Sequence, residues 1–195
     1  ISLAGTNNFF AGLGANGSTT KTSGSDNVAI GNQAGYALTG GTSVFIGSGS
    51  GQGSTTGAPN SGIGNTAVGS LSMQNNSTGF NNSAFGASAL KFNTTGVRNT
   101  AIGTAALINN TLGNQNVALG YTALFQNTSG SNNVALGYDA MHFNFTGVNN
   151  TSVGYQAGYG ITSGYSNTLV GDMTPSLPNI TTGGGNIGLG SNIFF

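Results

Sequence analysis

The side chains that could act as acids, bases or metal ligands are few and far apart in this chain of 195 residues. The carboxylates are Asp26, Asp139 and Asp172, and the single histidine, His142, follows Asp139 by three residues. A histidine–carboxylate pair can belong to a hydrolytic triad or a metal site, but both need at least one further group. No third partner lies near this pair in the sequence. We therefore expect Asp139 and His142 to be polar surface residues at positions where the residue type varies, and we expect no enzyme activity, metal or cofactor.

Two glycine-rich stretches superficially match dinucleotide-binding loops: "GLGANG" (12–17) and "GGGNIGLG" (183–190). That chemistry requires a helix directly after the glycines, so that its N-terminus faces the pyrophosphate. Neither stretch is followed by a helical pattern or a lysine, so we interpret both as chance matches.

The composition excludes several classes of partner. Charged residues make up 3% of the chain and the net charge is zero, whereas nucleic acids and anionic membranes are bound by clusters of Lys and Arg. No apolar run approaches the ~18–20 residues of a membrane span, and there is no cysteine for disulfides. The opening "ISLAGTNNFF" has no charged signal region, so we expect a fragment of a longer protein whose signal or anchor lies elsewhere.

The elements that would position any site come from an internal repeat. "NTAIGTAALINNTLGNQ" (99–115) is followed by two further blocks of seventeen residues with the same skeleton. About ten copies cover nearly the whole chain, and successive units cannot bury a core unless they stack. The sequence therefore predicts one domain over residues 1–195: an all-β parallel β-solenoid (β-roll) of about 10–11 coils, with irregular loops at 48–61 and 172–185.

Stacking would turn each fixed position of the repeat into a column of identical residues. Asparagine amides can hydrogen-bond along such a column, and Gly tolerates the left-handed backbone of tight corners. The predicted structural ladders are the asparagines Asn65, Asn82, Asn99, Asn116, Asn133, Asn150 and Asn167, and the glycines Gly69, Gly86, Gly103, Gly120, Gly137, Gly154 and Gly171.

Each unit contains two short β-like runs, such as "NTAIG" and "TAALI", and we expect two strands and two turns per coil. In the first run a small column that includes Ala101 alternates with a large column that includes Ile102, and the second pairs Ala106 with Leu107. A narrow coil cannot enclose every large column, so one should face outwards and be covered by another copy of the rod. Two or three copies both satisfy this argument.

The "NVAIG" and "NTAIG" motifs, each followed three residues later by Ala, resemble the head repeats of trimeric autotransporter adhesins, the YadA-like left-handed parallel β-roll. The full unit is also similar to repeats in trimeric tail fibres of phages and phage-derived bacterial fibres. The resemblance covers roughly residues 7–190 and implies a homotrimer, intertwined or side by side, on a bacterial cell surface or a virion. It implies attachment to a host or matrix glycan or protein, with a phage receptor-binding domain as the alternative. The familiar adhesin heads have shorter coils than seventeen residues, and the resemblance does not extend to a neck, stalk or membrane barrel.

Aromatic residues supply the candidate binding surface. Tyr121, Tyr138 and Tyr155 share the slot after the closing Gly on three consecutive coils, and Phe92 and Phe143 share another slot. An exposed aromatic strip can stack on sugar rings or pack against protein. The competing interpretation is a ladder that only covers the roll or a subunit interface.

A column of hydroxyl side chains gives a rival function, because flat threonine arrays on β-solenoids can bind ice. The column consists of Ser77, Thr94, Thr111, Thr128 and Thr162, is interrupted by Phe145, and lacks a second threonine row beside it. The irregular loops 48–61 and 172–185 are further candidates for specific contacts, because loops on rigid scaffolds commonly carry recognition.

Overall fold

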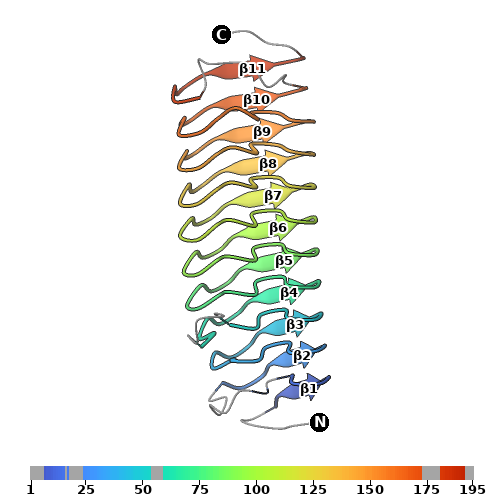
Figure 1. The fold of residues 1–195 in the computed structure, drawn as a ribbon. Coiled ribbons are helices and arrows are strands. Elements are labelled where there is room, and N and C mark those ends of the chain that lie inside the picture. The colour runs from blue at the N-terminus through green and yellow to red at the C-terminus, as the bar shows by residue number, and fades with distance from the viewer. Residues whose placement is uncertain (1–6, 16, 18–23, 54–58, 173–180, 192–195) are drawn as a thin grey trace.

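The protein is a rod in which one short strand from each coil stacks on the strand of the coil before it (Figure 1). The computed structural model describes residues 7–15, 17, 24–53, 59–172 and 181–191. All eleven strands form one parallel sheet in sequence order. The strands are β1 (Phe9–Ala11), β2 (Val28–Ile30), β3 (Val44–Ile46), β4 (Thr66–Val68), β5 (Ser83–Phe85), β6 (Thr100–Ile102), β7 (Val117–Leu119), β8 (Val134–Leu136), β9 (Thr151–Val153), β10 (Thr168–Val170) and β11 (Ile187–Leu189).

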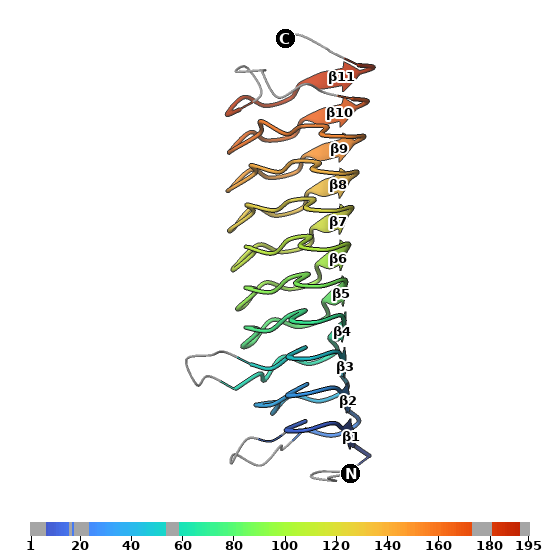
Figure 2. The same ribbon diagram turned by 45° about the vertical axis from the view of Figure 1, so that its right-hand side comes forward.

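The register of the sheet follows the repeat of the sequence. From β5 to β10 each strand begins 17 residues after the one before it, and Ala101, for example, pairs with Ala84 below and Ala118 above. The strands lie along one side of the rod, at the right of Figure 2, and the rest of each coil extends away from them to the left. At the usual strand spacing the sheet is about 50 Å long. The all-β parallel β-solenoid is confirmed, and the described residues contain no helix.

The prediction of a second strand in each coil is wrong. The run "TAALI" forms consecutive turns, because Ala105 and Leu107 have φ angles of 58° and 52°. This left-handed backbone at every second residue breaks the alternation of a strand, and Ala106 and Leu107 are therefore both buried. The amides still point along the axis: Ala105 donates to Ala87 of the preceding coil at 2.9 Å, and Leu107 to Ala123 of the next at 3.0 Å.

The core is a narrow column of small and medium apolar side chains. The central residue of the strand faces inwards, as Ala101 does, and packs with the buried alanine and leucine or methionine of the turn run. The first and third strand residues face outwards, so the large third column lies outside the core, with Ile102 39% exposed. This outer apolar column consists of Ile30, Ile46, Val68, Phe85, Ile102, Leu119, Leu136, Val153 and Val170.

Two asparagine ladders run inside the rod. In the first, Asn116 donates from its backbone N and from Nδ2 to Oδ1 of Asn99, at 3.0 and 3.2 Å, and Nδ2 also donates to the carbonyl of Gly130 at 2.8 Å. The same pattern joins all seven asparagines from Asn65 to Asn167. A buried amide without hydrogen-bond partners is strongly destabilising. Each coil therefore depends on its neighbour for the hydrogen-bond partners of its asparagine.

The second ladder lies in the turn region and ends where the repeat changes. It links Asn60, Asn76, Asn93, Asn110, Asn127 and Asn144 through side-chain amide bonds of 2.7 to 3.0 Å. The next position in this column is the buried Ile161, and the Oδ1 atom of Asn144 has no hydrogen-bond partner in the described structure.

Ile161 belongs to a coil in which core volume is redistributed. Gly158 occupies the position that Leu107, Leu124 and Met141 fill in the regular coils, and Ile161 packs into the space it leaves, 3.1 Å from where a Cβ of residue 158 would lie. In two earlier coils a glycine again occupies the position of Leu107, and a large side chain from another column fills the space: Leu38 beside Gly35, and Phe45 beside Gly51. The rod therefore conserves the volume of each layer rather than the residue in each column.

The closing glycines allow adjacent coils to approach each other closely. Gly103 has a φ of 133°, and a Cβ added there would overlap the carbonyl oxygen of Gly120 on the next coil. Gly190 occupies the same column with a φ of 112°, but a Cβ there would meet no described atom within 4 Å.

We predict that Gly103→Ala lowers the free energy of unfolding by about 3 kcal/mol or more, because backbone strain and a clash with the next coil add together. Gly190→Ala is the matched control, since it carries the strain without the clash, and about 1 kcal/mol is expected. Urea unfolding followed by circular dichroism measures both. Equal losses would show that close coil contact does not select glycine.

We predict that Gly158→Leu alone destabilises the protein by about 2–3 kcal/mol, because the new side chain overfills a layer that Ile161 already fills. The buried Ser152 stands in the strand column that Ala135 occupies one coil earlier, and its hydroxyl would overlap a Cβ at residue 158. The triple variant Ser152→Ala, Gly158→Leu and Ile161→Asn should therefore recover the stability to within about 1 kcal/mol. It restores a regular coil and offers an amide donor to Oδ1 of Asn144. Thermal unfolding measures the rescue, and a triple variant no more stable than Gly158→Leu would disprove the exchange of volume.

Candidate functional site

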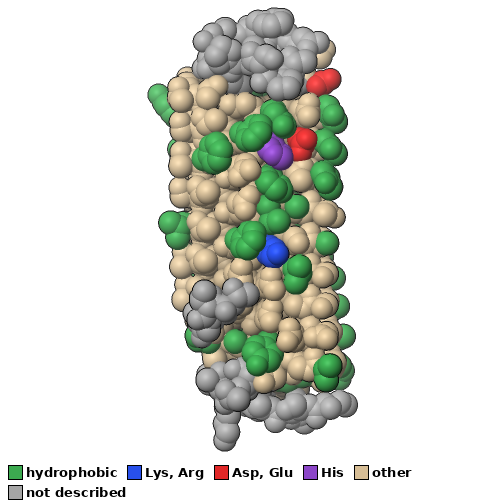
Figure 3. Space-filling view, in the orientation of Figure 1, with side chains coloured by type: hydrophobic (Ala, Val, Ile, Leu, Met, Phe, Trp, Pro, Cys, Tyr) green, Lys and Arg blue, Asp and Glu red, His purple; other side chains and the backbone are tan. Residues whose placement is uncertain are grey.

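Three tyrosines form an exposed ladder on consecutive coils. The ring centroids of Tyr121 and Tyr138, and of Tyr138 and Tyr155, are 5.3 Å apart, with the planes inclined by 15° and 14°. Each side chain is about half exposed, between 46% and 54%. Hydrophobic side chains line the edge of the rod at which the strand arrows end, and a second group lies on the face toward the viewer (Figure 3).

A second aromatic column runs through the same coils, five residues after the closing Gly. His142 is stacked between Phe125 and Tyr159, with ring centroids 4.9 and 5.2 Å away. Phe143 packs edge-on against His142 and Tyr159. Sequence analysis identified Phe143 but missed this column. Aligning the fifth residue after each closing Gly would have found it.

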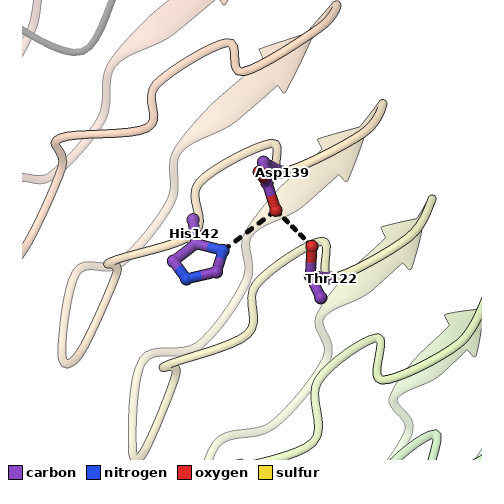
Figure 4. Close-up of polar contacts among 3 residues, drawn as sticks. All are labelled: Thr122, Asp139 and His142. Carbon is purple, nitrogen blue, oxygen red and sulfur yellow. Dashed lines mark hydrogen bonds and ion pairs between the residues drawn. The ribbon is translucent and has the colours of Figure 1, made fainter.

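Asp139 connects the two aromatic columns. Its Oδ1 atom accepts a hydrogen bond from the hydroxyl of Thr122 on the preceding coil and lies 3.1 Å from Nδ1 of His142 (Figure 4). Thr122 and Asp139 both follow a closing Gly by two residues, with φ angles of 53° and 52°, so the turn fixes their positions. Both contacts use Oδ1, and Oδ2 has no hydrogen-bond partner among the described residues. The carboxylate is thus held in place with one acceptor oxygen available.

The order of these three groups does not suit nucleophilic catalysis. In a triad the hydroxyl contacts the histidine, which removes its proton, while the carboxylate orients the histidine. Here the hydroxyl of Thr122 contacts the carboxylate instead. Within the described ranges no group of three or more histidine or acidic side chains could hold a metal ion. The arrangement is suited to orienting side chains at a surface.

Other charged side chains that the structure describes lie outside this region. Asp26 accepts hydrogen bonds from Asn7 and Ser25, which lower the pKa of its carboxyl group. The ammonium group of Lys91 lies 5.1 Å from the ring centre of Phe92, and no Lys or Arg occurs between residues 99 and 172. Phe92 lies three coils before Phe143. The structure does not bring these two candidate binding residues together.

We use the name aromatic patch for the surface formed by two aromatic columns and the carboxylate between them. Its negative charge comes from Asp139, which raises the pKa of the Tyr138 phenol above its ordinary value; reduced hydration and the neighbouring tyrosines add smaller contributions. The aromatic patch consists of Tyr121, Phe125, Tyr138, Asp139, His142, Phe143, Tyr155 and Tyr159.

The hydroxyl column is used inside the fold. Thr94 donates to the carbonyl of Thr111 at 2.9 Å, and Thr111 donates to that of Thr128 at 3.0 Å. Ser77, Thr128 and Thr162 do the same toward the next coil. A column whose hydroxyl protons are already committed is a poor template for ice, so no observation favours the ice-binding alternative.

The two irregular loops are described only in part. Residues 48–53 complete the coil after β3, with Ser50 buried, while 54–58 lie outside the described residues. In the loop 172–185, residues 173–180 lie outside them as well. The proposed role of these loops in recognition stays a prediction.

No family model, curated protein or solved structure matches the chain. Among the residues that the structure describes, no helix has the length and apolar character needed to cross a membrane.

We predict that Asp139→Asn moves the pKa of Tyr138 down toward the ordinary value of about 10. The charge of Asp139 opposes formation of the phenolate, so its removal lets tyrosinate form at lower pH. A pH titration of carbon-labelled tyrosine by NMR measures the shift. Asp26→Asn, in the first coils of the rod, is the control, and an unchanged Tyr138 titration in Asp139→Asn would contradict the assignment.

Proposed function

We propose that the chain is a non-enzymatic segment of an extracellular fibre or adhesin, a homotrimer that attaches to host or matrix surfaces. The observation that carries the proposal is the outer apolar column, which lies outside the core along most of the rod. Contiguous apolar surface of this extent is unusual on soluble monomers and commonly marks an interaction site. The other outward-facing column of these strands, formed by the first residue of each strand, holds no charged residue. This favours an apolar partner.

A second copy of the rod is the partner that matches this column over its length. Its own outer apolar column repeats at the same coil spacing, so contacts made at one coil recur at the next. Three copies, as the resemblance to adhesin heads and tail fibres implies, would cover the column and present three aromatic patches together. Several weak contacts on one rigid body give high avidity. The same physics serves a bacterial surface or a virion, including a phage receptor-binding domain.

We predict a solution mass near three times the 19.2 kDa of one chain, measured by light scattering. Ile102→Asp should shift the mass toward one chain, because it places a charge in the outer apolar column without entering the core. Thr100→Asp, on the same strand and face, should perturb assembly less. A wild-type mass near 19 kDa, or equal effects of the two variants, would remove the interface.

Attachment itself is tested with beads coated with the chain and washed over cultured bacterial cells, animal cells and matrix proteins. We expect retention on at least one of these surfaces above that of albumin-coated beads. The Ile102→Asp variant, coated at equal density, should be retained less, because separate chains lose avidity. Retention no higher than that of albumin on every surface would refute the proposed function.

A further inference from the structure

We infer that the aromatic patch binds a linear, uncharged glycan that lies along the rod axis, with three consecutive sugar units over Tyr121, Tyr138 and Tyr155. This inference rests on the proposed function, because it names the ligand class of an attachment surface. It also goes beyond it, since it assigns a site, an orientation and a length to the ligand.

The fold does not require the tyrosine ladder. In the same slot after the closing Gly, earlier coils have Ser48, Ser70, Ala87 and Thr104, and those coils stack in the same register. The second aromatic column has Tyr36, Gln52, Gln74, Lys91 and Ile108 in earlier coils. The coils that contain Tyr121, Tyr138 and Tyr155 are three consecutive coils in which both columns are aromatic, which points to a local role for these residues.

The geometry of the ladder determines which ligands fit it. Because the tyrosine rings stack on one another, Tyr138 has a neighbouring ring against each face, and the half-exposed side chains present mainly their edges to solvent. A cage for a quaternary ammonium ion needs open ring faces, so this class of ligand is disfavoured. A row of phenol hydroxyls between apolar ring edges instead suits a ligand that has both hydroxyl groups and apolar faces, as sugar rings do.

The spacing of the ladder favours a glycan over a peptide. The rings repeat at 5.3 Å, which is close to the length of one pyranose unit in a 1,4-linked chain. An extended peptide advances by about 3.3 Å per residue, so side chains on one face recur at about 6.6 Å and lose register over three rings. A linear glycan keeps one sugar unit at each coil.

Asp139 supplies the polar contact and the charge selection. Its side chain is only 14% exposed and is fixed through Oδ1 by Thr122 and His142, which leaves Oδ2 to accept a bond from a ligand hydroxyl. Hydrogen bonds to a charged acceptor are among the stronger ones. With no Lys or Arg from residue 99 to 172, sulfated or sialylated chains would meet repulsion, so the ligand is uncharged.

The test is calorimetric titration of the full chain with neutral 1,4-linked hexose oligomers of one to five units. We expect affinity to rise up to three units and then level off, and a sulfated trimer to bind at least tenfold more weakly. Tyr138→Ala should weaken binding of the neutral trimer about tenfold, and Asp139→Asn several-fold. Ser70→Ala, in the same slot on a coil without aromatics, should bind as the wild type does.

Several results would overturn the inference: no binding of any neutral oligomer, equal affinity for one and three units, or binding by Tyr138→Ala equal to that by Ser70→Ala. Tyr138→Phe keeps the stacking and removes one hydroxyl, and it should also lose affinity. Circular dichroism of each variant excludes a folding defect as the cause of lost binding.

The coated beads separate this inference from the proposed function. If wild-type beads are retained on cells and Tyr138→Ala beads are retained equally, the glycan site is wrong while attachment stands, and a protein-binding surface becomes the explanation. If wild-type beads are not retained but the oligomer titration succeeds with the expected length dependence, the site stands and the function in attachment fails.

Discussion

In-register stacking of buried asparagines is the constraint on which the structure depends. A coil of about seventeen residues encloses too little apolar volume to fold alone, and its corners bring polar backbone groups into the interior. The Asn116 side chain satisfies Asn99 below it and the Gly130 carbonyl of its own coil, and it is satisfied in turn by Asn133 above. Every coil thus supplies the partners that its neighbour lacks, and the ladder continues where the coil length departs from seventeen residues, as from Asn167 to Asn186.

Within that constraint the apolar residues are interchangeable as long as each layer stays filled. Gly158 with Ile161, and Gly51 with Phe45, move the large side chain to another column without breaking the sheet register. The polar columns are less tolerant. Where Ile161 replaces an asparagine, the amide oxygen of Asn144 below it is left without a partner. Volume can be exchanged between columns, but a hydrogen bond requires its partner at a fixed position.

The sequence was sufficient to predict the solenoid, its repeat length and the outward direction of one large apolar column, because these depend on spacing and on the alternation of strand residues. It was not sufficient for the run "TAALI". Ala105 and Leu107 take a left-handed backbone that neither residue favours by itself, and only stacking on identical coils imposes it. The contact of Thr122 with Asp139 was also missed, since it joins different residue types across a coil boundary. The tyrosine ladder was found because its members are identical and equally spaced.

The asparagine amides all point the same way along the rod. Nδ2 of Asn82 donates toward Asn65, and Nδ2 of Asn93 donates toward Asn76, so in both ladders the amino groups face β1 and the carbonyl oxygens face β11. Their dipoles add head to tail, as peptide dipoles do in a helix. Although the chain has zero net charge, its aligned amide dipoles run along the long axis of the rod. They distinguish its two ends for any molecule that approaches along that axis.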